Sequence, residues 1–210
     1  MLSVRIPATG GRFGSRFRRS VPRVLVAALA MPIFVSACSS PPAPAFDLTA
    51  PASPSRRSAL AGRQIVVPEP STIGPLEAER IVAHDAANSI SYISGAQWAD
   101  RLPRLFQARL IQTFENGSSV RASRPGDGVV GDYQLNTNIR AFQLDASRSE
   151  AYVEVSLNLV DLKSGKLVSG RVVSRRVPVP DGRGATVAQG LDRALSGVLL
   201  DIVRWVGGGR

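Results

Sequence analysis

A histidine followed by an aspartate is the sequence's clearest candidate for acid–base chemistry. His84 ends the run 80–84, and Asp85 follows it directly. A carboxylate beside an imidazole can orient a general base. Adjacent residues on a strand point to opposite faces, however, and no G-x-S-x-G motif supplies a nucleophile. A structural or surface histidine is therefore favoured, and a hydrolase that uses His84 or a nearby serine stays open as an alternative.

Two further patterns resemble binding or catalytic motifs in letters only. Gly126, Gly128 and Gly131 satisfy G-x-G-x-x-G, but a dinucleotide site needs a strand before this pattern and a helix after it. Here a strand pattern follows and Asp127 would repel phosphate, so the segment is predicted to be a turn. Glu77 and Glu79 lie in a polar loop as solvated charges. We therefore expect no catalytic residues, and hence no enzyme.

Metal and cofactor chemistry is restricted by composition. The 210 residues contain one cysteine, Cys38, and one histidine, which excludes an intramolecular disulfide framework and any multi-thiolate or multi-histidine metal cluster. No P-loop or two-metal pattern is present. We expect no bound metal and no cofactor.

The positive charge of the chain is concentrated at its beginning. Lys and Arg number 26 against 16 Asp and Glu, a formal charge of +10. Residues 1–37 hold six of the arginines and no acidic residue, which leaves 20 basic against 16 acidic residues in the remainder. A basic segment followed by the short apolar run 24–35 is typical of a secretory signal, and the run is too short to span a membrane comfortably.

The end of this signal, Val35-Ser36-Ala37-Cys38, resembles the lipobox of bacterial lipoproteins. The resemblance implies cleavage between Ala37 and Cys38 and diacylation of the Cys38 thiol, with palmitate-like chains that anchor the protein to the membrane. An incidental cysteine in an ordinary signal is the less favoured alternative. Ser39 follows the cysteine, and by the same resemblance this favours the outer membrane, with the protein facing the periplasm.

Composition divides the chain into four parts. Residues 1–37 are the predicted signal peptide, and residues 38–62 are a lipidated cysteine with a Pro/Ala/Ser-rich tether. Residues 63–206 are long enough for one domain with its own core, and residues 207–210 form a short tail. The tether is predicted to hold the domain clear of the membrane.

Alternating apolar residues predict strands within this domain. Short strand patterns cover 64–67, 80–84 and 89–93, the last two joined by a hairpin through 85–88. Longer ones cover Tyr133 to Ile139, Val153 to Leu159 and Leu167 to Val179, and they read as an antiparallel meander with one wetted face. The alternation slips at Ala141-Phe142, where a bulge is predicted.

Two segments have helical periodicity instead. The first spans about 100–115, with Asp100 as the expected cap, Pro103 in the first turn and Asn116-Gly117 as the stop. The second carries an apolar stripe from Leu191 to Val206. The predicted fold is α+β, a two-layer sandwich in which an antiparallel sheet packs against two amphipathic helices.

Three arginines on the last long strand, Arg171, Arg175 and Arg176, are candidates for a basic patch. Nucleic-acid binding is not expected, because stacking aromatics do not accompany the charges. Protection of a strand edge by charge is the plainer explanation, and anionic lipid headgroups or an acidic partner are the functional one.

Three blocks of sequence resemble the ABC-type transport auxiliary lipoproteins, the family that includes the paraquat-inducible protein C-like lipoproteins. They are residues 92–110, read Tyr-Ile-Ser-Gly-Ala-Gln-Trp-Ala-Asp-Arg-Leu-Pro-Arg-Leu-Phe-Gln-Ala-Arg-Leu, residues 132–142 and residues 159–168. By this resemblance Tyr92 and Trp98 are candidate partner-binding residues. A Trp on the apolar stripe of a helix is more often in the core, however.

The resemblance implies a function in transport between membranes. Family members work with a mammalian-cell-entry (MCE) type substrate-binding protein and with the permease and ATPase of an ABC transporter, moving lipids or other hydrophobic compounds. The expected function is therefore a non-enzymatic, outer-membrane lipoprotein that docks these partner subunits. A structural or assembly lipoprotein without a transport role is the alternative.

Overall fold

Three long antiparallel strands form one side of the sheet in this computed structural model, which describes residues 43–52 and 58–208. They are β7 (Tyr133–Asp145), β8 (Glu150–Asp161) and β9 (Leu167–Pro178). Their alternate apolar side chains, Val153, Val155 and Leu157 among them, are fully buried on one face. The predicted meander is confirmed, and the register shift between Ile139 and Ala141 confirms the predicted bulge.

The rest of the sheet includes parallel pairs, so the prediction of a wholly antiparallel sheet was wrong. The described residues form a nine-stranded mixed sheet. Three short strands lie one after another beside β7, all parallel to it: β2 (Gln64–Val66), β3 (Ser71–Thr72) and β4 (Arg80–His84). They act as one interrupted strand, because prolines between β2 and β3 cannot donate to the ladder.

Three more strands complete the sheet. The predicted hairpin is present, with β5 (Ile90–Trp98) antiparallel to β4. The chain returns after the first helix as β6 (Arg121–Ser123), parallel to β2. At the other side β1 (Ala45–Phe46) pairs in parallel with β5.

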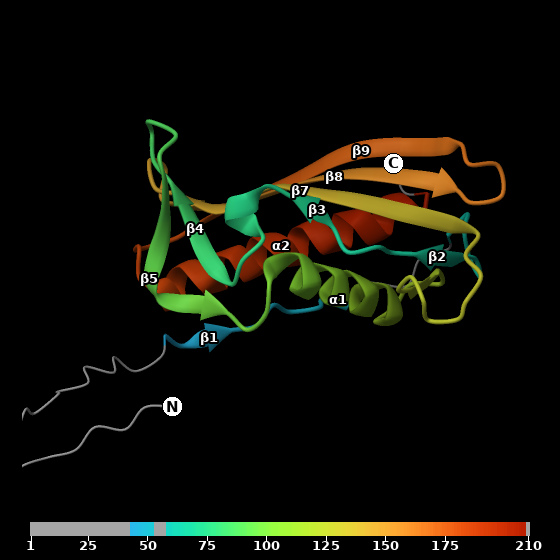
Figure 1. Ribbon diagram of the computed structural model, residues 1–210, viewed down its shortest axis with the longest axis horizontal. Helices are drawn as coiled ribbons and strands as arrows, with labels where there is room; N and C mark the ends of the chain where they lie inside the picture. Colours follow the sequence, from blue (N-terminus) through green and yellow to red (C-terminus); the bar gives the residue numbers. More distant parts are fainter. Residues whose placement is uncertain (1–42, 53–57, 209–210) are drawn as a thin grey trace, which may run out of the picture. The chain divides into compact units, whose positions relative to one another are not determined.

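Two helices bury their apolar sides against this sheet and each other. The first, α1 (Leu102–Glu115), has Arg101 as its N-cap residue with no side-chain cap bond, so the predicted capping by Asp100 was wrong. The second, α2 (Gly184–Val206), begins seven residues before the predicted stripe. It runs beneath the long strands and contacts β8 and β9 (Figure 1). The α+β class is thus confirmed, with a mixed sheet.

The described part of the predicted tether lies on the domain. Besides β1, Leu48 is 4% exposed within the core, and Asp47 forms an ion pair with Arg109 of α1. Thr49 donates its backbone N–H to Asp192 of α2 at 2.6 Å. This segment packs on the domain because burial of the apolar side chains of Phe46 and Leu48 lowers the free energy.

Residues 41–210 form one compact unit, and its hydrophobic core extends from Leu48 to Val206. A unit that contains its own core can fold without the preceding residues. Among the described residues, no helix combines the length and the apolar character needed to cross a membrane.

Candidate functional site: an open sheet edge and its surroundings

Strand β9 is an open edge of the sheet, since within the described residues it pairs only with β8. Val179 donates its N–H to Ser149 O at 2.8 Å, at the start of β8. Because donors alternate along an antiparallel strand, the N–H groups of Arg176, Ser174 and Val172 point away from β8. Pro178 fits this alternation, since it lacks an N–H where none is needed. The edge therefore offers unpaired donors and acceptors.

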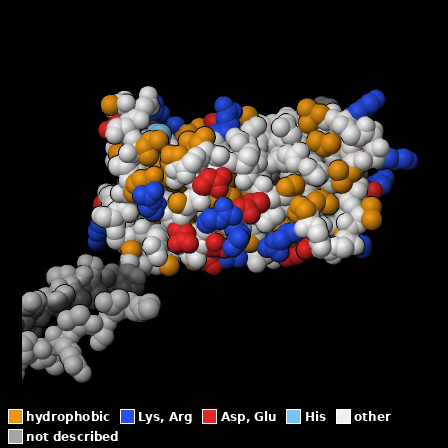
Figure 2. Space-filling view, in the orientation of Figure 1, with side chains coloured by type: hydrophobic (Ala, Val, Ile, Leu, Met, Phe, Trp, Pro, Cys, Tyr) orange, Lys and Arg blue, Asp and Glu red, His pale blue; other side chains and the backbone are white. Residues whose placement is uncertain are grey.

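Apolar side chains accompany this edge. Leu167 is 61% exposed, Val168 54% and Val172 47%. Hydrophobic side chains are visible in Figure 2 at the end of the molecule that carries the β8–β9 turn, whereas acidic and basic side chains are intermixed over the centre of that face. An edge with exposed apolar residues can accept an added strand.

The three candidate arginines do not form one patch. Positions 171 and 175 share the face of β9 that carries buried Val173, which is the side of α2, while Arg176 lies on the opposite face. Arg175 pairs with Asp201 of α2, and Arg204 approaches the same carboxylate at 3.1 Å. No ion pair of Arg171 occurs among the described residues. The side chain of Arg175 passes over Gly197, where a Cβ would lie 3.1 Å from its Cγ.

Arg176 instead links all three long strands. Its guanidinium lies 3.8 Å from the centre of the Tyr152 ring and donates to Asp145 at 3.1 Å and to Glu150 at 3.3 Å. Burial opposes its charge, but these two carboxylates raise the pKa of Arg176 above its usual value. The hydrogen bond from the Ser147 hydroxyl lowers the pKa of Asp145 most, and the hydrogen bond from Arg176 lowers it further. This geometry indicates a structural role for Arg176.

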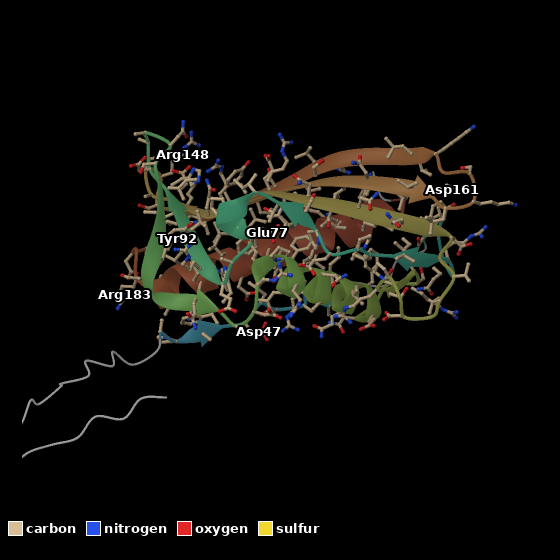
Figure 3. The ribbon with its side chains drawn as sticks, viewed as in Figure 1. Asp47, Glu77, Tyr92, Arg148, Asp161 and Arg183 are labelled. Carbon is tan, nitrogen blue, oxygen red and sulfur yellow. The ribbon has the colours of Figure 1, made fainter. Side chains whose placement is uncertain are left out.

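The two aromatic candidates lie in different environments. Tyr92, labelled on β5 in Figure 3, is 39% exposed, with the Arg80 guanidinium 3.7 Å from its ring centre. Trp98 is 1% exposed and meets Phe142 edge to face, with ring centres 5.6 Å apart. It ends β5 and is not part of the helix. Tyr92 is thus accessible to a partner, whereas Trp98 belongs to the core.

Among the described residues, no hydrogen bond joins the side chains of His84 and Asp85. Asp85 Oδ1 accepts the backbone N–H groups of Ala87 and Ser89, so this carboxylate oxygen holds the β4–β5 turn. Glu77 pairs with Arg101 at 3.3 Å, as an exposed surface ion pair. Across residues 43–52 and 58–208, no three His, Cys, Asp or Glu side chains cluster as a metal ion would require.

The glycine-rich segment 126–131 is a turn, as predicted. Gly126 and Gly128 have φ values of 90° and 75°, and Asp127 accepts the N–H of Arg124 at 2.7 Å. The predicted cleavage and lipidation residues, Ala37 and Cys38, lie outside the described residues. Asp201, which organises two of the arginines, is a residue that sequence reasoning missed, although its i, i+3 spacing to Arg204 was a usable signal.

Solved structures share this fold. A crystal structure of protein XCC0632 from Xanthomonas campestris matches with a TM-score of 0.71 and 21% sequence identity, over 78% of this chain and 95% of that one. A second crystal structure, of an uncharacterized protein, matches with a TM-score of 0.58 and 14% identity, over 74% of this chain and 99% of the other. At these identities the likeness concerns the fold alone.

A sequence relative and a family model connect the chain to a protein class. The protein bll6063 of Bradyrhizobium diazoefficiens is 29% identical over 163 residues, which are 76% of this chain and 44% of that protein. The chain thus spans less than half of that relative's length. The model of the ABC-type transport auxiliary lipoprotein component matches residues 46–203. The chain therefore belongs to the ABC-type transport auxiliary lipoprotein family.

Proposed function

We propose that this protein is a non-enzymatic auxiliary lipoprotein of an MCE-linked ABC transport system for lipids or other hydrophobic compounds. We further propose that acylated Cys38 anchors it to the outer membrane, facing the periplasm. Family membership over residues 46–203 supports the transport role. The predicted signal sequence, which ends at Ala37 and is followed by Cys38 and Ser39, supports the anchor and the choice of the outer membrane.

The proposed mechanism is docking of a partner subunit on β9. The observation that carries it is the open edge, a 12-residue strand with one hydrogen-bonded neighbour among the described residues and with exposed Leu167 and Val172. Main-chain hydrogen bonds of an added strand give affinity, and side chains on alternate positions give specificity. Long edges of this kind are usually protected when they have no partner.

A pair of substitutions at one position tests this mechanism. Ser174→Pro removes an outward N–H without breaking a bond to β8, whereas Ser174→Ala keeps the N–H and removes only the hydroxyl. Proline is tolerated at such edge positions. We expect the permease, the ATPase and the MCE-type protein to co-purify from solubilised envelopes with wild type and Ser174→Ala, and to be lost with Ser174→Pro.

A second variant and the composition of the recovered complex complete the experiment. Val172→Lys places a charge at the edge and opposes strand addition, so it should also abolish co-purification. This variant keeps the mechanism testable if Ser174→Pro proves unstable. Equal recovery with all variants would exclude β9 as the docking site. Recovery of peptidoglycan or outer-membrane assembly factors alone, without transporter subunits, would favour the structural alternative.

A further inference from the structure

Beside the inner face of β9, two adjoining cavities lie between that strand and the end of α2. The larger has a volume of ≈ 580 Å³ and mainly apolar walls. Its lining includes Leu60, Tyr133, Leu159, Val168, Arg171 and Trp205. This volume is within the range of about 300 to 1,000 Å³ found for small-molecule sites.

The smaller cavity, ≈ 310 Å³, is cationic. Arg171, Arg175 and Arg204 line it together with one acidic residue, Asp201. Asp201 is shared, because it pairs with both Arg175 and Arg204. Arg171 has no ion-pair partner in the part of the chain that the structure describes. Three guanidinium groups against one carboxylate leave an excess of positive charge at this cavity.

The two cavities share two residues, Arg171 and Trp205. An apolar compartment therefore lies next to a cationic one, and Arg171 and Trp205 contribute to the walls of both. Guanidinium groups bind phosphate and carboxylate through paired hydrogen bonds, while an apolar compartment gains free energy by burying hydrocarbon. Binding both ends at once requires a ligand with an anionic group next to a hydrocarbon chain.

We propose that this double cavity binds an amphiphile with one acyl chain and an anionic headgroup, a lysophospholipid or a fatty acid. The chain lies in the larger cavity against Leu159 and Val168, and the headgroup meets Arg171. The proposal deepens the transport function above and rests on it for its biological role. The binding itself is a property of this domain alone.

Purified residues 41–210, which contain the entire described core, allow a direct test. The probes are lysophosphatidylglycerol, lysophosphatidylcholine and palmitate, titrated below their micelle-forming concentrations. Binding is followed by calorimetry and by intrinsic fluorescence, to which Trp205 and the buried Trp98 both contribute. We expect saturable binding of one molecule, tighter for lysophosphatidylglycerol than for the zwitterionic choline lipid of the same chain. Comparison with palmitate separates a phosphate from a carboxylate headgroup.

Three variants assign the two ends of the ligand. Arg171→Gln should weaken lysophosphatidylglycerol about tenfold and lysophosphatidylcholine less, because the choline cation offsets the charge of the phosphate that Arg171 binds. Val168→Asp places a charge in the larger cavity and should weaken both lipids about tenfold. Leu167→Asp is the matched control, since Leu167 is similarly exposed on the same strand but lines neither cavity, and it should bind like wild type.

Several results would overturn the proposal: no saturable binding by folded protein, equal losses in Leu167→Asp and Val168→Asp, or unchanged affinity for both lipids in Arg171→Gln. Native mass spectrometry of the full chain, extracted from membranes in mild detergent, should show a noncovalent single-chain lipid that is lost in Val168→Asp. Failure here with intact recovery of transporter subunits would reject the lipid site alone. Lipid binding without such recovery would reject the docking function alone.

Discussion

Asp181 and Arg183, immediately before α2, form a local ion pair whose effect can be measured at a single residue. Arg183 donates to Asp181 through its side chain at 2.9 Å and through its backbone N–H at 3.0 Å. The side-chain bond first, and the backbone bond next, lower the pKa of Asp181 to about 2. The carboxylate form is therefore favoured by the fold.

The titration of Asp181 should reflect this pair. We expect a carboxyl NMR titration midpoint of about 2 in the wild type, and a midpoint nearer the usual Asp value of about 3.9 in Arg183→Ala. A lowered folded-state pKa means that the contribution to stability is present above pH ~4 and is lost as the pH falls through about 2. Identical midpoints in the two proteins would show that the Arg183 side chain is not the cause.

At the scale of elements, the packing of α2 depends on a glycine that faces the sheet. A Cβ added at Gly190 would lie 2.7 Å from Val179 Cγ2 and 3.2 Å from Ala151 Cβ, and both neighbours are buried. At Gly197, seven residues later, the added Cβ meets only the flexible side chain of Arg175, at 3.1 to 3.3 Å. An added methyl group would therefore clash with buried core residues at Gly190, whereas at Gly197 the Arg175 side chain can move aside.

We predict opposite signs for the two changes. Gly190→Ala should destabilise the domain by about 1 kcal/mol net, because overpacking of ~1–3 kcal/mol exceeds the helix-propensity gain of ~1 kcal/mol. Gly197→Ala should be neutral or stabilising by up to ~1 kcal/mol. Urea unfolding of both variants gives the free energies. A stabilised Gly190→Ala would mean that α2 does not approach β8 and Val179 this closely.

At the scale of the whole molecule, the greatest possible reach from Cys38 to the domain is shorter than the composition suggests. The Pro-rich segment 39–62 alone could reach some 75 Å as a polyproline-like chain. Because the domain already includes β1, seven residue steps separate Cys38 from Ala45, and they extend at most about 25 Å. A lipidated Cys38 would therefore hold the domain close to the membrane surface.

Intact-mass analysis of the mature protein tests the anchor on which this depends. We expect a chain that begins at Cys38 and carries two or three acyl groups, because durable anchoring requires more than one chain. Cys38→Ser should lack this modification and accumulate with its signal attached. An unmodified wild-type chain that begins at another residue would contradict the lipoprotein prediction and with it the outer-membrane anchor.

Periodicity alone identified the long elements of the domain. The alternation of Val153 to Leu159 and the helical stripe after Leu191 both correspond to buried faces, because side-chain direction repeats every 2 residues in strands and every 3.6 in helices. The same parity rule places Arg176 opposite Arg171 and Arg175, so the absence of a single arginine patch was predictable from the numbering.

What the sequence by itself determined was the faces of the long strands and helices and the family resemblance; the signal peptide and the lipidation of Cys38 are predictions from the sequence. Tertiary structure decided which segments meet: the parallel course of β2, β3 and β4 along β7, the burial of Trp98 and Leu48, the shared Asp201, and the adjacent cavities at Arg171. The physical reason is that periodicity specifies which side of a segment avoids water, whereas pairing direction and cavities arise only where segments distant in sequence meet.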